Sequence, residues 1–231
     1  MVKTALIAGF CAFANPAEAC RLALILALDV SSSVDAAEDR LQRAGLAAAL
    51  IAPDVQAAFL ASPDPVALFV FEWSGRYNQD NIARWTMIND PGDLYTVAQA
   101  VLESTRVNDD FPTAMGYALG HAAIQMQQMP QCAFHTIDLA GDGINNEGFS
   151  PVQAYAAFPF EGVSVNGLVI QTQGDDDPAA FYRDHVIRGR GAFFETANGF
   201  ADYENAMRRK LIREVAPLIL GDAATKPAAA G

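Results

Sequence analysis

The sequence is poor in basic residues, and this shortage argues against several classes of function. Lysine and arginine together number 15, against 27 aspartate and glutamate residues. The formal net charge is therefore −12, and the pI is near 4.5. Nucleic-acid binding needs a basic surface that neutralises phosphates, so this composition argues against it. The same charge disfavours association with a bilayer rich in anionic lipids.

The sequence also lacks the motifs of common catalytic sites. It contains no G-x-S-x-G nucleophile elbow and no phosphate-binding G-x-x-x-x-G-K, and Ser31 stands where an aspartyl phosphotransferase would carry its second aspartate. The histidines His121, His135 and His185 have neither H-x-x-x-H nor H-E-x-x-H spacing, which argues against a zinc site. An enzyme with Ser31 as nucleophile and His121 or His135 as base stays open, because spacing alone does not exclude it.

Long hydrophobic runs are scarce, although 52% of the residues are hydrophobic. The apolar stretch at residues 5–14 is too short to span a bilayer. It follows Lys3 and precedes a small-x-small cleavage sequence at residues 17–19, so residues 1–19 are interpreted as a signal peptide. We therefore expect an exported protein, periplasmic or secreted, with no transmembrane segment in its mature chain. A lipid anchor on Cys20 is the less favoured alternative.

The remaining chain is long enough to bury one sizeable core, and it shows no internal repeat. One domain is expected over residues 20–220, with a flexible tail at residues 221–231. Buried strands are predicted at residues 22–29, 65–73, 133–140 and 164–170, a half-exposed edge strand at 82–88 and a sixth strand at 191–196. Helices are predicted at residues 34–60 with a break at Pro53, at 93–104, from 111 onward, at 152–158 and at 200–220. This alternation predicts a doubly wound α/β fold, with a mostly parallel six-stranded sheet, one antiparallel edge strand and helices on both faces.

Oxygen-bearing side chains follow two of the predicted strands. Asp29, Ser31 and Ser33 come at the end of the first strand, and Asp142 follows the strand at residues 133–140. In open α/β sheets, ligands bind at the carboxyl ends of the strands, and carboxylate and hydroxyl oxygens suit a hard cation such as Mg²⁺ or Ca²⁺. The alternative is that the sequence D-V-S-S-S only ends a strand and caps a helix.

The chain resembles a von Willebrand factor A-type (vWA) domain over nearly all of residues 20–220. The metal-ion-dependent adhesion site (MIDAS) of that family combines D-x-S-x-S after the first strand, a threonine at the start of a middle helix and Asp-Gly after the fourth strand. Asp29, Ser31, Ser33, Thr113 and Asp142 match these positions. The sequence departs from the family before the threonine, where Phe111-Pro112 replaces a frequent glycine.

This resemblance implies a binding mechanism. The hydroxyls of Ser31, Ser33 and Thr113 would bind Mg²⁺, or Ca²⁺ or Mn²⁺, while Asp29 and Asp142 would bind it directly or through water. A cation held by only two carboxylates keeps exchangeable positions, and a carboxylate of a protein partner could fill one of them. The resemblance therefore implies a metal-dependent protein-binding module rather than an enzyme, and it leaves the oligomeric state open.

Four further segments resemble a family of exported bacterial proteins that carry this domain: Glu72-Trp73-Ser74-Gly75, residues 142–146, Tyr182-Arg183 with Val186-Ile187, and residues 208–211. This closer likeness implies no particular substrate or partner. Two alternatives remain, namely a hydrolytic enzyme that uses Ser31 or the metal site, and a structural module whose metal site is vestigial.

Two other acidic groups have competing interpretations. Residues 175–177 are three consecutive aspartates between Gly174 and Pro178, and a solvated turn is favoured over a calcium loop. Asp109 and Asp110 precede the helix predicted at Thr113. They could extend the negative field of the metal site or complement the helix dipole, and the sequence favours neither explanation.

Two cysteines remain after the predicted signal peptide, and their spacing predicts a disulfide between them. Cys20 lies nine residues before Asp29, and Cys132 lies ten residues before Asp142. If the two aspartates lie at the same end of neighbouring parallel strands, the cysteines lie at the opposite end, about 4.8 Å apart. That separation suits a disulfide, and an even cysteine count is typical of exported proteins. Two buried free thiols are the alternative.

Overall fold

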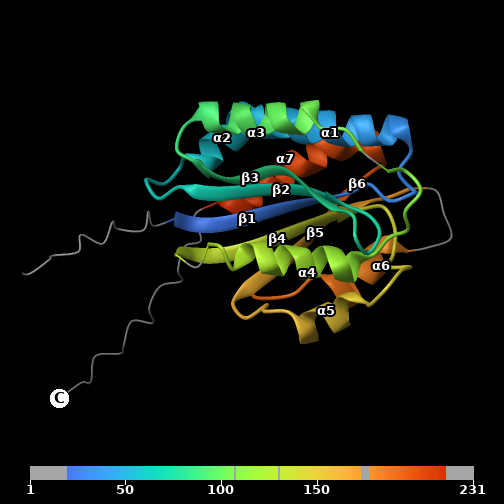
Figure 1. Ribbon diagram of the computed structural model, residues 1–231. Coiled ribbons are helices and arrows are strands. Elements are labelled where there is room, and N and C mark those ends of the chain that lie inside the picture. Colours follow the sequence, from blue (N-terminus) through green and yellow to red (C-terminus); the bar gives the residue numbers. More distant parts are fainter. Residues whose placement is uncertain (1–19, 107, 130, 173–176, 217–231) are drawn as a thin grey trace, which may run out of the picture.

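The structure is a computed structural model that describes residues 20–216, apart from residues 107, 130 and 173–176. A six-stranded sheet with the order β3-β2-β1-β4-β5-β6 forms its centre (Figure 1). The strands are β1 (Cys20–Asp29), β2 (Val66–Trp73), β3 (Gln79–Ile88), β4 (Cys132–Gly141), β5 (Val163–Ile170) and β6 (Phe194–Ala197). Only the β2–β3 pair is antiparallel. The predicted mostly parallel sheet with an antiparallel edge strand is confirmed.

Strand β1 lies near the middle of the sheet because its sequence is apolar on both faces. Leu22, Leu24, Leu26 and Leu28 belong to one hydrophobic core, whereas Ala23, Ile25 and Ala27 belong to the other. A strand whose successive side chains point to opposite faces can fill two cores only if both sets are apolar. The run of apolar residues that marks β1 in the sequence thus fixes its central position.

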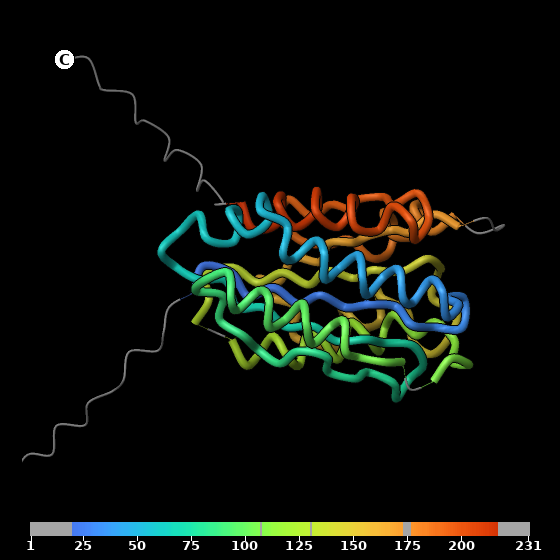
Figure 2. The backbone as a smooth tube through the Cα atoms, turned by 90° about the horizontal axis from the view of Figure 1, so that it is seen from above, coloured from blue at the N-terminus to red at the C-terminus, as the bar shows by residue number. Residues whose placement is uncertain are grey.

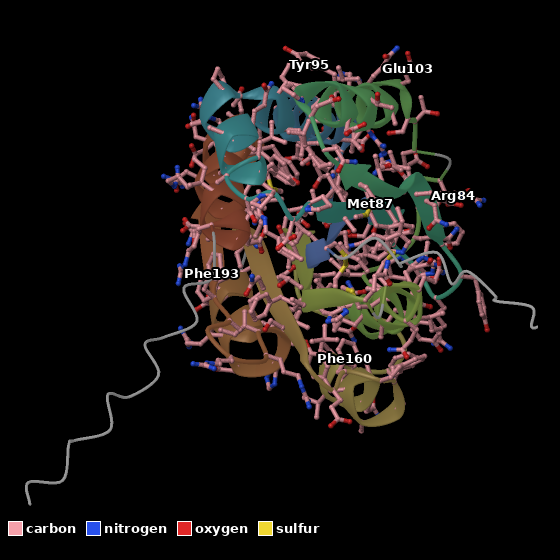
Figure 3. The ribbon with its side chains drawn as sticks, turned by 90° about the vertical axis from the view of Figure 1, so that its left-hand side faces the viewer. Arg84, Met87, Tyr95, Glu103, Phe160 and Phe193 are labelled. Atoms are coloured by element: carbon pink, nitrogen blue, oxygen red, sulfur yellow. A yellow bond between two sulfur atoms is a disulfide. The ribbon has the colours of Figure 1, made fainter. Side chains whose placement is uncertain are left out.

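Helices cover both faces of the sheet (Figure 1). One face carries α1 (Ala36–Ile51), α2 (Pro53–Phe59), α3 (Pro91–Glu103) and α7 (Tyr203–Val215), and the other carries α4 (Met115–Met126), α5 (Pro151–Ala157) and α6 (Pro178–Phe181). Seen from above, α1 lies between α3 and α7 (Figure 2). Figure 3 views these layers from the amino ends of the parallel strands, with Tyr95 and Glu103 at the outer surface of α3 and Phe160 on the opposite side of the sheet.

Several predicted boundaries were wrong. The helix predicted from residue 111 begins at Met115, because the Phe111 and Thr113 carbonyls accept hydrogen bonds from Ser32 and Asn146 instead of from the following helical turn. Strand β3 begins three residues earlier than predicted, and β6 is shorter than predicted. Helix α7 begins at Tyr203, after a 3₁₀ turn at Phe200–Asp202, and ends at Val215, whereas residues 217–220 of the predicted helix lie outside the described part of the chain. The sequence analysis predicted neither α6 nor the π-helical turn η1 (Tyr182–Val186), although Asp177-Pro178 is a typical start of a helix.

Some predictions lie outside the described residues. These are the signal peptide at residues 1–19, the tail at 221–231, and Asp175 and Asp176 of the acidic turn. Asp177 is described, and its carboxylate caps α6 by accepting a hydrogen bond from the Ala180 N–H at 2.9 Å. Within residues 20–216, apart from the gaps named above, no helix has the length and apolar character needed to cross a membrane.

A disulfide joins Cys20 and Cys132, as their spacing predicted. The two residues are direct partners in the parallel register of β1 and β4, and their Cα atoms are 4.5 Å apart. They lie at the amino ends of both strands. The carboxyl ends of the same strands, at the right of Figure 1, carry the polar residues predicted to bind a metal.

Candidate metal centre

The five predicted ligands meet at the carboxyl ends of β1 and β4. These strands are neighbours in the sheet, so the loop after Asp29 and the loop that begins at Asp142 lie side by side. The segment before α4 brings Thr113 to the same point. Ligands bind in this kind of crevice in open α/β sheets, because the chain turns in opposite directions from the two central strands.

A continuous set of hydrogen bonds connects the five residues. The Thr113 hydroxyl donates to Ser31 Oγ at 3.1 Å, and Ser31 Oγ lies 3.2 Å from Ser33 Oγ. The Ser33 hydroxyl in turn donates to Asp142 Oδ1 at 2.7 Å. Asp29 Oδ1 accepts a hydrogen bond from the Ser31 backbone N–H at 2.8 Å. Three loops that are distant in sequence thus bring three hydroxyls and two carboxylates together.

The electrostatics of this cluster favour a cation. Asp29 is fully buried, and burial, followed by the negative charge of Asp142, raises its pKa to about 8. Burial also raises the pKa of Asp142, although the hydrogen bond from Ser33 opposes that change. Asp29 Oδ2 has no hydrogen-bond partner within the described residues. A bound cation would stabilise the charged form of both carboxylates.

The donor set fits a hard divalent cation better than a soft one. All five side chains offer oxygen, which Mg²⁺ and Ca²⁺ prefer, whereas zinc is usually held by nitrogen and sulfur. Across the described part of the chain, no group of three or more histidine, cysteine, aspartate or glutamate side chains is placed to hold a metal. Any cation bound here would therefore depend on the hydroxyls as well as on the carboxylates.

The loop that carries Thr113 is held from two sides. Asn146 Oδ1 accepts a hydrogen bond from the Thr113 N–H at 2.8 Å, and the Asn146 N–H donates to the Thr113 carbonyl at 3.0 Å. The Phe111 carbonyl accepts from the Ser32 N–H at 2.8 Å, which joins this loop to the loop after β1. Thr113 therefore reaches the cluster even though Phe111-Pro112 replaces the usual glycine.

Two further side chains hold the loop after β1, and the sequence analysis missed both. Gln42 of α1 is fully buried and donates to the Asp29 carbonyl at 2.9 Å. Arg106 donates to the Val34 carbonyl at 2.6 Å. Gln42 precedes the buried Leu46 and Leu50 at helical spacings of four, and this position is a signal that could have been used, because buried polar side chains normally have a bonding role. Arg106 lies in a polar loop and gave no such signal.

The histidines do not form a catalytic pair with Ser31. His121 lies 3.2 Å from Asn81 Oδ1, and His135 Nε2 lies 2.9 Å from the Met129 carbonyl. Ser31 Oγ instead contacts the hydroxyls of Ser33 and Thr113. A serine nucleophile needs a base within hydrogen-bond reach, and this geometry supplies no imidazole for that role.

The structure argues against one of the two explanations of Asp109 and Asp110, namely that they complement the dipole of the following helix. Helix α4 starts at Met115 and has no acidic residue in its first turn, so neither aspartate complements its dipole. Both residues are exposed. Asp109 lines a cavity of about 630 Å³ between α1 and the loop after α3, together with Arg40 and Arg106.

The most similar solved structures include vWA domains. The structure of proximal thread matrix protein 1 from the mussel byssus is 17% identical, with a TM-score of 0.61 over 85% of this chain and 48% of that chain. Another structure of that mussel protein has a zinc-occupied MIDAS motif. A von Willebrand factor type A structure from Catenulispora acidiphila is 16% identical, with a TM-score of 0.61 over 85% of this chain and 43% of that one. Manganese-loaded TRAP protein from Plasmodium vivax is 17% identical, with a TM-score of 0.57 over 84% of this chain and 73% of that one.

These likenesses establish the fold, and this chain spans less than half of the mussel and Catenulispora chains. No curated protein matches the sequence. The sequence family described as "Protein of unknown function (DUF1194)" matches residues 19–219. The chain has the vWA-like α/β fold and belongs to the DUF1194 family.

Proposed function

We propose that this protein is an exported, metal-dependent protein-binding module. Ser31, Ser33 and Thr113 would hold a divalent cation through their hydroxyls, together with the carboxylates of Asp29 and Asp142. Mg²⁺ is the preferred candidate, with Ca²⁺ and Mn²⁺ as alternatives. The cation would supply an electrophilic position that captures a carboxylate of the partner protein.

The observation that carries this proposal is the convergence of five oxygen-bearing side chains from three loops. Ser31 Oγ and Ser33 Oγ lie 3.2 Å apart, and Ser33 reaches Asp142 at 2.7 Å, so small movements would let all of them face one ion. The mussel and Plasmodium structures of the same fold contain zinc and manganese respectively, which supports a divalent cation in this fold. The disulfide supports export, since disulfides persist in oxidising compartments.

Metal binding is tested by calorimetric titration of the purified protein with Mg²⁺ and Mn²⁺. Ser31→Ala should weaken the affinity at least tenfold, because it removes a ligand that also contacts Thr113 and Ser33. Ser32→Ala is the matched control. Ser32 lies in the same loop, but it is exposed and its side chain makes no hydrogen bond to another described residue. A wild-type protein that binds neither ion would show that the site is vestigial.

The partner is tested with an envelope extract of the source organism. Proteins that the wild type retains in Mg²⁺ should be lost in a chelator and should not be retained by Asp29→Ala. Free acetate at millimolar concentration should release them, because it competes for the same position on the cation. Proteins retained equally by Asp29→Ala would not be partners of the metal site.

A further inference from the structure

Tyr182 is a fully buried residue whose hydroxyl has no hydrogen-bond partner within the described part of the chain. It begins the π-helical turn η1, which follows α6 on the α4 side of the sheet (Figure 1). Its ring crosses β5 at Gly167, where a Cβ atom would lie only 2.5 Å from ring atom Cδ1. Buried tyrosine hydroxyls usually have a partner, and leaving one unpaired destabilises the fold. Packing alone would be served equally well by phenylalanine.

A second buried oxygen without a partner approaches the same point next to Gly141 as this hydroxyl. A Cβ atom built at Gly141 of β4 would lie 2.8 Å from the Tyr182 hydroxyl oxygen and 2.9 Å from Asp29 Oδ2. Neither oxygen has a hydrogen-bond partner among the described residues. The two atoms therefore converge on the space that remains open because Gly141 has no side chain. A tyrosine phenol is protonated at neutral pH and can donate a hydrogen bond to a carboxylate oxygen.

We propose that Tyr182 is a positioning residue of the metal centre, whose hydroxyl donates a hydrogen bond to Asp29 Oδ2, directly or through one water molecule beside Gly141. This inference rests on the proposed metal site. Asp29 Oδ1 already accepts the Ser31 N–H at 2.8 Å, so a donor at Oδ2 would hold both oxygens of the carboxylate. A phenol orients the carboxylate without adding a charge, and partners of this kind commonly govern how tightly a metal is held.

The test compares Tyr182→Phe with Tyr203→Phe. Tyr203 is also fully buried and its hydroxyl also lacks a partner within the described residues, but it packs among α1 and α7 on the opposite face of the sheet. Each variant removes one buried oxygen and keeps the ring. Tyr182→Phe should lower the Mn²⁺ affinity measured by calorimetry about tenfold, the lower end of the range for such partners. Tyr203→Phe should leave that affinity within twofold of the wild type.

A spectroscopic measurement separates positioning from a general loss of structure. Mn²⁺ should produce a near-ultraviolet tyrosine difference spectrum in the wild type and in Tyr203→Phe, and this signal should be lost in Tyr182→Phe, while the thermal midpoints without metal stay close. Unchanged Mn²⁺ affinity in Tyr182→Phe, or an equal loss in Tyr203→Phe, would overturn the inference and leave the metal site intact. A wild-type protein that binds no Mn²⁺ would overturn both proposals.

Discussion

At the scale of single residues, the burial of Asp29 dominates the chemistry of the cluster. Its side chain is 0% exposed, and the charge of a second carboxylate, Asp142, adds to burial in raising its pKa. The backbone hydrogen bond from Ser31 lowers the pKa, but it does not offset burial. An ionised Asp29 therefore destabilises the metal-free fold, and a cation would remove that cost.

This arrangement predicts how the stability of the metal-free protein depends on pH. The pKa of Asp29 rises from about 3.9 in the unfolded chain to about 8 in the fold, so its contribution to stability is present below pH 4 and is lost as the pH rises through 8. Asp29→Asn cannot ionise and should lose less stability between pH 5 and pH 9. At pH 9 the free energy of unfolding of Asp29→Asn should exceed that of the wild type by several kcal/mol at most, since one pKa unit corresponds to about 1.4 kcal/mol.

Urea denaturation at several pH values, in a chelator, measures this effect. Asp138 also titrates in this range, because burial raises its pKa to about 7. The informative quantity is therefore the difference between the two proteins and not the slope of either one. Parallel curves for wild type and Asp29→Asn would contradict the prediction.

At the scale of elements, the sequence predicted correctly the strands whose residue pattern clearly indicates their secondary structure and burial. The apolar run from Leu22 to Leu28 suits a strand buried on both faces, and two such strands at a switch of strand order place their polar ends together. The start of α4 was predicted wrongly, because the position of Thr113 depends on Asn146, 33 residues later. Contacts of this kind leave no local periodicity. Turn η1 was missed for the same reason, since Tyr182 is held by packing on β5.

Helix α7 is attached to the sheet through a buried ion cluster. Lys210 is 0% exposed, and its ammonium group lies 2.9 Å from Asp138 of β4 and 2.5 Å from Glu214. Asn166 of β5 also donates to Glu214 at 2.8 Å. One buried cation thus faces two buried carboxylates, so removing it would leave negative charge uncompensated in the core.

Lys210→Met should therefore destabilise the protein by about 3–5 kcal/mol, the cost typical of breaking a buried ion pair. Arg208→Met is the control on the same helix, because Arg208 pairs with Asp54 at the exposed surface and should contribute less than about 1 kcal/mol. The loss in Lys210→Met should be smaller at pH 5 than at pH 8, since burial raises the pKa of Asp138 to about 7 and this carboxylate can take up a proton. Chemical denaturation at the two pH values measures these losses. Equal losses in Lys210→Met and Arg208→Met would refute the conclusion that the buried ion cluster stabilises the fold more than the exposed pair.

The first turn of α4 makes a close contact with the segment after Asn146. A Cβ atom at Gly116 would lie 2.1 Å from the Phe149 carbonyl oxygen, so this position admits only glycine without movement. At Gly143, next to Asp142, a Cβ atom would meet nothing within 4 Å. The two glycines therefore differ sharply in how they should tolerate a methyl group.

Gly116→Ala should destabilise the protein by roughly 1–3 kcal/mol through overpacking. It should also weaken Mn²⁺ binding, because the displaced segment includes Asn146, which holds Thr113. Gly143→Ala should change neither property by a measurable amount. Thermal unfolding and Mn²⁺ titration measure both properties in both variants. A loss of Mn²⁺ affinity in Gly143→Ala alone would contradict the conclusion that Gly116, and not Gly143, is required.

At the scale of the whole molecule, the parallel register of β1 and β4 connects the two ends of the sheet. Cys20 pairs with Cys132, and the same register pairs Leu28 with Ala140. The next pair in this register would be Asp29 and Gly141, and Asp142 then lies one residue beyond the end of β4. Asp29 follows Cys20 by nine residues and Asp142 follows Cys132 by ten, so the two aspartates are offset by one residue at the carboxyl end of the strand pair. This offset lets Asp142 reach Ser33, and it leaves Gly141 between Asp29 and Tyr182.

The disulfide and the metal centre should consequently contribute to different properties. A strand of ten residues spans about 30 Å, so the two features lie at opposite ends of β1. The bridge joins residues separated by 112 positions, and in the chain-entropy model such a loop stabilises the fold by about 4–5 kcal/mol through its effect on the unfolded state. Protein purified from an oxidising compartment should show no free thiol when denatured without reductant.

The double variant Cys20→Ala/Cys132→Ala should therefore lose roughly 4–5 kcal/mol of unfolding free energy in urea and keep the Mn²⁺ affinity of the wild type. Reduction of the wild-type protein should give the same loss, whereas reductant should not affect the variant. If the variant loses metal affinity in parallel with stability, the amino end of the β1–β4 pair controls the geometry of the carboxyl end. The register would then act as a rigid unit, and the separation of stability from binding argued above would fail.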